Sequence, residues 1–346
     1  GLPPPTAEQK AAMTAPFAPG VVVAGAGSGK TETMAGRVVW LVANGLVRPE
    51  QVLGLTFTRK AARELGSRMR RRLAQLGARG VLDHALDADP TLLDGEPTVI
   101  TYDAFAARIV AEHALRLGRE PGDRLITEAV AWQYATRVVE GHGGDMAHVV
   151  HAPTTVVDQV LALHSELAGH LVEPGRLAEF ARELRAEVER LPSSSRTRSR
   201  HYAEVAKALA VQDARAQLIP LVEEFRELKR ANEAVDFGDQ AELAARLAER
   251  FPEVGVAERA RFAVVLLDEY QDTNHAQLVL LRALFGGGHP VTAVGDPCQS
   301  IYGWRGANAG TLTTFGREFR DSSGTDAVQA SLTTSFRNGA RILAVA

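Results

Sequence analysis

Short apolar runs alternate with helical stretches in the first part of the chain. Residues 21–24 and 52–57 are apolar runs of strand length, whereas 30–43 and 59–76 repeat apolar residues at helical spacing. Strands that alternate with helices are typical of an α/β fold with a parallel sheet. The start of the chain therefore predicts the first part of such a sheet.

The middle of the chain has a different pattern. From about residue 104 to 250 it is almost wholly helical, with a polar, basic stretch at 191–200 that predicts a loop. Apolar runs of strand length return after residue 260, within 262–272 and 290–299. These changes predict a sheet that is completed across a helical insertion.

Composition limits the classes of protein that remain. The net charge of −3 excludes a uniformly basic surface but allows a local basic patch. The single cysteine, Cys298, excludes an internal disulfide framework and a cysteine zinc cluster, which fits a reducing cytoplasm. No apolar run approaches the roughly 20 residues of a membrane helix, and no signal-peptide pattern opens the chain. We therefore expect a cytoplasmic protein with no membrane partner.

A glycine-rich bend follows the first predicted strand, in AGAGSGKT at 24–31. Its backbone N–H groups can surround an anion, and a helix that starts near Lys30 adds the positive end of its dipole. Lys30 supplies a cation for outer phosphates, and the Thr31 hydroxyl can ligate magnesium. Ala24 replaces the first glycine of the G-x-x-x-x-G-K-[ST] pattern, and the plain alternative is an ordinary strand-to-helix turn. The predicted cradle consists of Ala26, Gly27, Ser28 and Gly29.

Two adjacent acids, Asp268 and Glu269, end the apolar run that starts at 264. At the carboxyl end of a strand, Asp268 can hold magnesium while Glu269 orients and deprotonates a water. Neighbouring strand residues point to opposite faces, so these roles require both acids to lie at the strand's tip. Alone, an acidic strand end fits a capping turn equally well. Together with the glycine-rich bend, it predicts hydrolysis of a nucleoside triphosphate.

Further motifs occur in order along nearly the whole chain. They are TAEQKAA (6–12), LTFTRKAARELGSRM (55–69), ITYDAFAARI (100–109), VDFGDQ (235–240), LLDEYQDTNHAQ (266–277), AVGDPCQSIYGWRGAN (293–308) and SFRN (335–338). With the two phosphate elements, this set resembles the superfamily 1A DNA helicases, the UvrD/Rep/PcrA and RecB group. The arginine-rich sequence and GDPCQ are also similar to motor subunits of actinobacterial AdnAB-type helicase–nucleases.

The resemblance implies a RecA-like P-loop NTPase sheet, of α/β class, with an inserted helical subdomain. The first motor domain is expected at 1–103 and 233–322, interrupted by the helical subdomain at 104–232, and 323–346 would begin a second RecA-like domain. The chain starts without methionine and ends in mid-pattern, so we expect a fragment that lacks motifs V and VI. Such a fragment should bind nucleotide, and DNA weakly, with little processive activity alone.

Residue roles on the nucleotide side also follow from the resemblance. Gln9 matches the glutamine that reads adenine, and Gln299 matches the glutamine that senses the terminal phosphate. Arg337 matches the arginine that reaches the γ-phosphate, and Phe336 stands where a stacking tyrosine is commoner. The implied catalytic residues are Glu269, Lys30, Gln299 and Arg337.

The DNA side combines hydroxyl, basic and aromatic residues. Hydroxyls and helix-start amides near residue 58 can contact phosphates, and basic residues add salt-sensitive affinity, although Arg70–Arg72 favour a solvated helix face. An exposed aromatic turn at 302–305 favours base stacking. Asp103 stands where many relatives have histidine, which puts a DNA contact there in doubt. The predicted DNA-binding residues are Phe57, Thr58, Arg59, Tyr102, Tyr302, Trp304 and Arg305.

The resulting hypothesis is an ATP- and Mg²⁺-dependent DNA translocase or helicase motor that moves 3′-to-5′ on single-stranded DNA. Its partners would be single-stranded DNA, duplex/single-strand junctions and a second motor or nuclease subunit, in DNA repair or recombination. One alternative is a nucleotide-binding but catalytically idle structural subunit. Another is a P-loop phosphotransferase, which gives no reason for the aromatic turn.

Other polar groups have plainer interpretations. A metal site among the residues His142, Asp145, His148 and His151 competes with a simple loop-to-helix junction, which we favour. Asp236 and Asp239 fit helix capping and packing better than catalysis. Cys298 is expected to be incidental to the chemistry.

Overall fold

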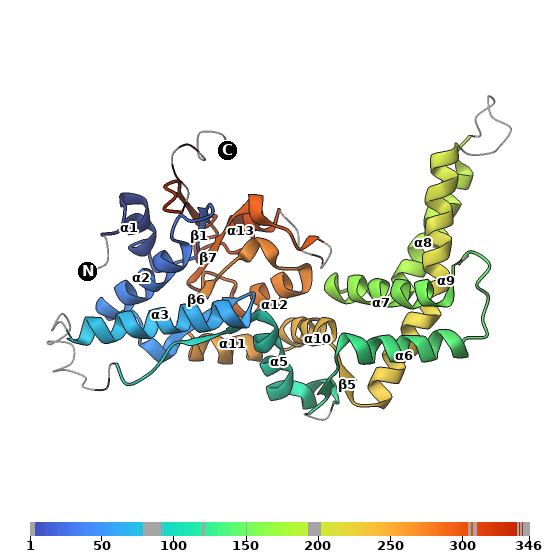
Figure 1. Cartoon of the computed structure of the whole chain (residues 1–346), viewed down its shortest axis with the longest axis horizontal. Helices are drawn as coiled ribbons and strands as arrows, with labels where there is room; N and C mark the ends of the chain where they lie inside the picture. Colours follow the sequence, from blue (N-terminus) through green and yellow to red (C-terminus); the bar gives the residue numbers. More distant parts are fainter. Residues whose placement is uncertain are drawn as a thin grey trace. The chain divides into compact units, whose positions relative to one another are not determined.

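The computed structural model divides into two compact units (Figure 1). The sheet unit comprises Gly1–His113 and Leu243–Ala346, and the helical unit comprises Ala114–Glu242. The boundaries expected from the sequence stay a prediction. The described residues are 4–78, 91, 93–119, 122–149, 151–192, 202–303, 306, 310–337, 339 and 341.

The sheet unit contains six strands in the order β3-β2-β6-β7-β1-β8, and every neighbouring pair is parallel. This arrangement confirms the predicted α/β class and parallel sheet. The three strands β2, β6 and β7 are buried along their whole length, as expected for a parallel sheet covered on both faces. The strands are β1 (Gly20–Ala24), β2 (Val52–Thr56), β3 (Thr98–Thr101), β6 (Val264–Leu267), β7 (Val291–Gly295) and β8 (Val328–Leu332).

Helices cover both faces of this sheet. Val22 and Val294 belong to the buried core shared with α1, α2 and α3. The alternate residues point to the opposite face, where α13 contacts β1 and β7. The helices of this unit are α1 (Ala7–Met13), α2 (Lys30–Ala43), α3 (Arg59–Ala78), α5 (Tyr102–His113), α11 (Pro252–Arg261), α12 (His275–Phe285) and α13 (Thr311–Glu318). The predicted elements at 21–24, 30–43, 52–57 and 59–76 are thus confirmed as β1, α2, β2 and α3.

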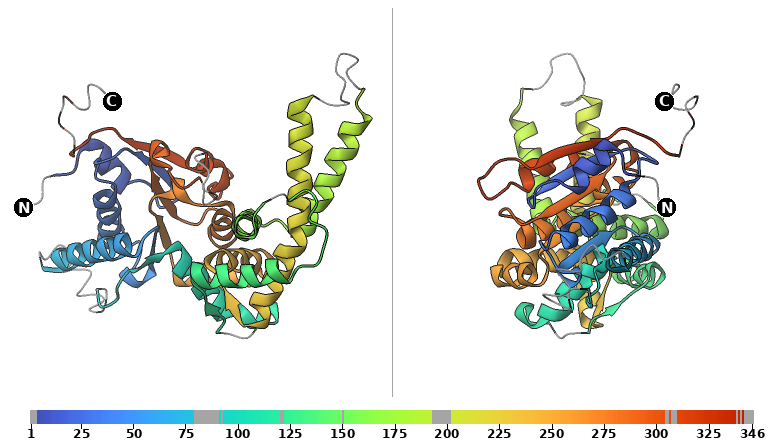
Figure 2. Two further views of the ribbon diagram at one scale, coloured as in Figure 1. Left: turned by 45° about the vertical axis from the view of Figure 1, so that its right-hand side comes forward. Right: turned by 90° about the vertical axis from the view of Figure 1, so that its left-hand side faces the viewer.

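The helical unit is built around α9, which spans 29 residues. In Figure 2, α8 lies side by side with the first half of α9, and α6 and α7 pack on its second half. A short parallel pair, β4 with β5, completes the unit. Its elements are β4 (Arg124–Leu125), α6 (Glu128–Gly141), α7 (Pro153–Gly169), α8 (Pro174–Arg190), α9 (Ala203–Ala231) and β5 (Ala234–Val235), and α10 (Phe237–Arg250) begins there. No helix in the described ranges combines the length and apolar character needed to cross a membrane.

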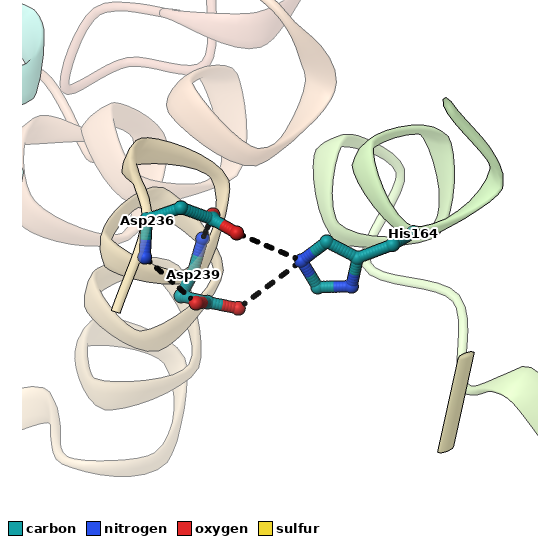
Figure 3. Close-up of side chains that lie close together, drawn as sticks. All are labelled: His164, Asp236 and Asp239. Carbon is teal, nitrogen blue, oxygen red and sulfur yellow. Dashed lines mark hydrogen bonds and ion pairs between the residues drawn. The ribbon is translucent and has the colours of Figure 1, made fainter. Parts of the chain in front are cut away.

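A buried charged cluster ties α7, α9 and α10 together. Figure 3 shows three of its members, His164, Asp236 and Asp239. The Lys229 ammonium lies 2.5 Å from Asp236 Oδ2, 2.6 Å from Asp239 Oδ2 and 2.8 Å from His164 Nε2. The two aspartates also cap α10 reciprocally, since each accepts a hydrogen bond from the other's main-chain N–H at 2.9 Å. The capping prediction is therefore confirmed, and the cluster is a structural junction.

The same cluster has ligand types that suit a metal ion. His164, Asp236 and Asp239 bring their ligand atoms within 4.8 Å of one another. Lys229, whose side chain is 3% exposed, already contacts all three groups and supplies the positive charge. A cation would have to displace this lysine, so the residues do not fit a metal site.

We predict that Lys229→Met destabilises the helical unit. The substitution leaves two carboxylates enclosed without their cation, and breaking a buried ion pair in this way costs about 3–5 kcal/mol. Thermal unfolding followed by circular dichroism should therefore begin at lower temperature. Lys207→Met changes an exposed lysine of the same helix and should leave the unfolding curve unaltered. Equal curves for both variants would contradict the assigned role.

The cluster also predicts a pH window for this unit. Burial opposes ionisation, but hydrogen bonds with the aspartates raise the pKa of His164, and contacts with His164 and Lys229 hold the pKa of Asp236 and Asp239 below the usual range. The aspartate contribution is present above pH ~4 and disappears as pH falls further, whereas the His164 contribution is complete below pH ~6.5 and disappears as pH rises past its raised pKa. Unfolding free energies measured across pH should be largest between these limits. A flat profile would contradict this.

Candidate functional site

The glycine-rich bend lies at the carboxyl end of β1 and leads directly into α2. Gly27 and Gly29 have φ of 75° and 85°, a left-handed conformation that favours glycine. The Ser28 hydroxyl donates to the Gly25 carbonyl at 2.8 Å, which closes the turn. Because α2 begins at Lys30, main-chain N–H groups and the positive end of the helix dipole share one point. This geometry suits a phosphate group.

Gln9 lies against this bend although it comes from α1. The residue is 6% exposed, and its side-chain Nε2 donates to the Ser28 carbonyl at 3.0 Å. A Cβ placed on Gly29 would lie only 2.6 Å from that nitrogen, so a side chain there would displace the Gln9 amide. Arg37 of α2 holds the segment after α1 by donating to the carbonyls of Ala15 and Pro16 at 2.9 and 2.8 Å.

The segment after β8 also reaches the bend. The Phe336 N–H donates to the Gly27 carbonyl at 2.8 Å, and a Cβ on Gly27 would lie 2.4 Å from Arg337 Cβ. Phe336 itself is 63% exposed. The structure therefore brings Gln9 and the adjacent residues Phe336 and Arg337 to the glycine-rich turn from two distant parts of the sequence.

Both acids lie past the end of β6, as their predicted roles require. Asp268 is 5% exposed, and Glu269 has a φ of 49°, a strained value for a residue with a side chain. The Lys30 Nζ atom lies 2.8 Å from Glu269 Oε2. The lysine of the bend and the second acid thus meet across 239 residues of sequence.

The acids create an excess of negative charge. Burial, and then the neighbouring Glu269, raise the pKa of Asp268 to about 7, and the same two causes raise the pKa of Asp272 to about 6. Asp272 Oδ1 is buried and has no hydrogen-bond partner among the described residues. Lys30 alone does not balance three carboxyl groups. Closely spaced carboxylate oxygens of this kind suit a hard divalent cation.

The turn after β7 carries the predicted phosphate sensor. Asp296 Oδ2 accepts a hydrogen bond from Gln299 Nε2 at 2.5 Å, and Asp296 Oδ1 accepts one from the Cys298 N–H at 3.0 Å. These bonds fix Gln299 near the carboxyl ends of β6 and β7. Cys298 contributes its main chain here, and its side chain is exposed.

An aromatic pair lies at the end of the same segment. The Tyr302 ring stacks on Phe57, which follows β2, with centroids 4.6 Å apart and planes inclined by 26°. Thr58 and Arg59 are exposed beside Phe57, and the Thr58 hydroxyl accepts a hydrogen bond from the Ala61 N–H at 3.1 Å. The predicted residues Trp304 and Arg305 lie outside the described residues.

Tyr102 is placed differently from the other aromatic residues. The residue is 4% exposed, and its hydroxyl donates to the Asp268 carbonyl at 3.0 Å. The structure therefore puts Tyr102 with the acids rather than with the aromatic pair, because the end of β3 carries it into the interior. Burial raises its pKa well above the usual value, so it stays a neutral donor.

Several contacts had no signal in the sequence. Glu32, in the first turn of α2, pairs with Arg68 at 2.9 Å and with Arg72, and Glu96 lies 3.6 Å from Arg70, so two arginines of the predicted solvated face are ion-paired. Gln271, beside the acids, contacts both Glu269 and the turn after β7. Outside this site, His142 and Asp145, for which a loop-to-helix junction was favoured over a metal site, contact Glu224 and Gln217 of α9.

Comparison with known proteins gives a family. The UvrD/REP helicase N-terminal domain matches residues 5–320. The chain is 31% identical over 330 residues to ATP-dependent DNA helicase UvrD1 of Mycobacterium leprae (strain TN), covering 91% of this chain and 36% of that protein. It is 28% identical over 312 residues to ATP-dependent DNA helicase PcrA of Leuconostoc citreum, covering 90% and 35%.

A PcrA of Staphylococcus aureus (strain Mu50 / ATCC 700699) is 28% identical over 321 residues, covering 91% of this chain and 36% of that protein. The chain thus spans about a third of the length of these relatives. The matched range includes the glycine-rich bend, both acids and the turn after β7. The chain belongs to the UvrD/REP helicase N-terminal domain family, within the superfamily 1A helicases.

Proposed function

We propose that the chain binds ATP and forms the first part of an ATP-dependent DNA helicase motor. The observation that carries this proposal is the 2.8 Å contact between Lys30 and Glu269, which joins a phosphate-binding bend to a carboxylate pair. The relatives named above are ATP-dependent DNA helicases, which supports the same activity here.

Each nucleotide-side residue then has a role. Main-chain groups of Ala26, Gly27, Ser28 and Gly29 hold the phosphates, and Thr31 and Asp268 hold Mg²⁺. When bound, the ion neutralises the phosphate oxygens and polarises the terminal phosphate. Gln9 and Phe336 contact the base, and Arg337 and Gln299 approach the terminal phosphate.

The Lys30–Glu269 pair must open for this reaction. Lys30 carries the cation that the outer phosphates need, and Glu269 Oε2 is engaged while it accepts from Lys30. Once Lys30 turns to the phosphates, this oxygen can accept a proton from a water. The contact between the two side chains therefore describes the resting arrangement of the site.

On the DNA side, the pair of Phe57 and Tyr302 offers aromatic faces for bases, with Thr58 and Arg59 beside them for phosphates. Trp304 and Arg305 would extend this surface. We further propose 3′-to-5′ movement on single-stranded DNA in the cytoplasm, with a role in repair or recombination. Duplex junctions and a second motor or nuclease subunit are proposed partners. The likeness to AdnAB-type subunits stays a prediction.

A catalytically idle motor is the alternative. We predict that Glu269→Gln lowers kcat for ATP hydrolysis by about 10²–10⁴-fold, because the amide cannot accept a proton. Nucleotide affinity should change little, since the side chain keeps its size. Steady-state hydrolysis with and without a single-stranded oligonucleotide, and titration with a fluorescent ATP analogue, measure the two effects. Glu249→Gln, an exposed change on α10, is the control.

The outcomes separate the two functions. An unaltered protein that binds ATP without hydrolysing it would support the idle motor. Hydrolysis that persists in Glu269→Gln would show that Glu269 is not the general base and would contradict the proposed catalytic role.

The aromatic pair generates a separate prediction. Tyr302→Ala should weaken the binding of single-stranded DNA by about 1–3 kcal/mol, the usual contribution of one stacked base. Tyr302→Phe keeps the ring and should bind like the unaltered protein. Fluorescence anisotropy with a labelled oligonucleotide gives both affinities. Equal affinity for the alanine and phenylalanine variants would show that this ring does not stack on DNA.

A further inference from the structure

We propose that Gln271 is a positioning residue that links Glu269 to the turn after β7 and so makes ATP hydrolysis respond to DNA. This inference rests on the proposed function. Gln271 lies in the 3₁₀ turn Tyr270–Asp272, between the acids and α12, and is 1% exposed. A buried amide needs partners for both its oxygen and its nitrogen.

The partners of Gln271 fix the orientation of its amide. Oε1 accepts a hydrogen bond from the Asp296 N–H at 3.0 Å, and Nε2 donates to Glu269 Oε2 at 3.0 Å and to Asp272 Oδ2 at 3.3 Å. A main-chain N–H can only donate, so the amide oxygen must face Asp296. The NH₂ group must then face the carboxylates, and the reversed amide would oppose like groups at both ends.

The end of β7 is shaped to admit this amide. A Cβ on Gly295 would lie 2.4 Å from Gln271 Oε1 and 3.2 Å from a methyl carbon of Leu312. Gly295 is not among the glycines with positive φ, so the backbone itself does not require glycine there. The missing side chain instead leaves room for Gln271 to reach Asp296.

The hydrogen bonds continue from Gln271 into the turn after β7, which carries Asp296 and Gln299. Asp296 receives the Gln271 contact on its N–H and holds Gln299 through its carboxylate at 2.5 Å. Three residues beyond Gln299, Tyr302 stacks on Phe57. A DNA strand that moves this aromatic pair therefore acts on a segment that is connected through Gln271 to Glu269.

Gln271 gains importance when the phosphates are bound. Among the described residues, Lys30 and Gln271 donate side-chain hydrogen bonds to Glu269, both to Oε2. The proposed function withdraws Lys30 to the phosphates. Gln271 then continues to orient the carboxylate that must meet the attacking water, and small displacements of such a group cost much of the rate.

The test uses the full-length protein. Gln271→Met keeps the side-chain length and removes both polar ends. We expect kcat in saturating oligo-dT to fall by about tenfold or more, while KM for ATP and the affinity for oligo-dT change by less than about twofold. Disrupted packing alone would not separate these three quantities in this way.

A second variant and a matched control isolate the amide. Gly295→Ala leaves Gln271 intact but places a methyl group against its oxygen, so it should reproduce the loss of kcat. Ser300→Ala removes the 3.3 Å contact between the Ser300 hydroxyl and the Gln271 main-chain oxygen and spares the amide. This control should keep full stimulation by oligo-dT.

A double-mutant cycle with Gln299→Ala completes the test. If Gln271 and Gln299 act through one connection, their combined loss of stimulated kcat is smaller than the product of the single losses. Full stimulation in Gln271→Met, or independent losses in the cycle, would overturn the positioning role. An unaltered protein without DNA-stimulated hydrolysis would instead overturn the proposed function itself.

Discussion

The parallel direction of the sheet is the constraint on which the site depends. β6, β7 and β1 are neighbours in the sheet, so their carboxyl ends lie at one edge. Each end delivers one part of the site: the two acids after β6, the turn that carries Gln299 after β7 and the glycine-rich bend after β1. The contact between Lys30 and Glu269 follows directly from this arrangement.

Charge imposes the second constraint. Burial makes ionisation of the three carboxyl groups costlier, and near one lysine they also repel one another, which is why the pKa of Asp268 rises to about 7. A neutral donor is useful in such a place. The Gln271 amide can hold Glu269 without adding a charge that would compete with Lys30 or with a divalent cation. The buried Tyr102 hydroxyl, which donates to the Asp268 carbonyl, is a second neutral contact of this kind.

Local patterns in the sequence predicted the local parts of this structure. The ends of β1, α2, β2 and α3 lie within two residues of their predicted ends, because apolar spacing and glycine position act over a few neighbouring residues. The acids were predicted at a strand tip for the same reason. The contacts of Glu32 with α3, of Gln271 with Asp296 and of Lys229 with His164 depend on how distant elements pack. Nothing in the sequence around Gln271 indicates that its side chain accepts a hydrogen bond from the main-chain N–H of Asp296, 25 residues later.

Two lysines differ in burial and in the number of their partners, and this difference matches their different roles. Lys229 is 3% exposed and contacts two carboxylates and a histidine, so moving it would leave several buried groups without partners. Lys30 is 12% exposed and pairs with the single carboxylate of Glu269, which is itself 34% exposed. When Lys30 leaves, water and the Gln271 amide can donate hydrogen bonds to that carboxylate. The first lysine is therefore held in place, whereas the second can exchange its partner for a phosphate, as the proposed function requires.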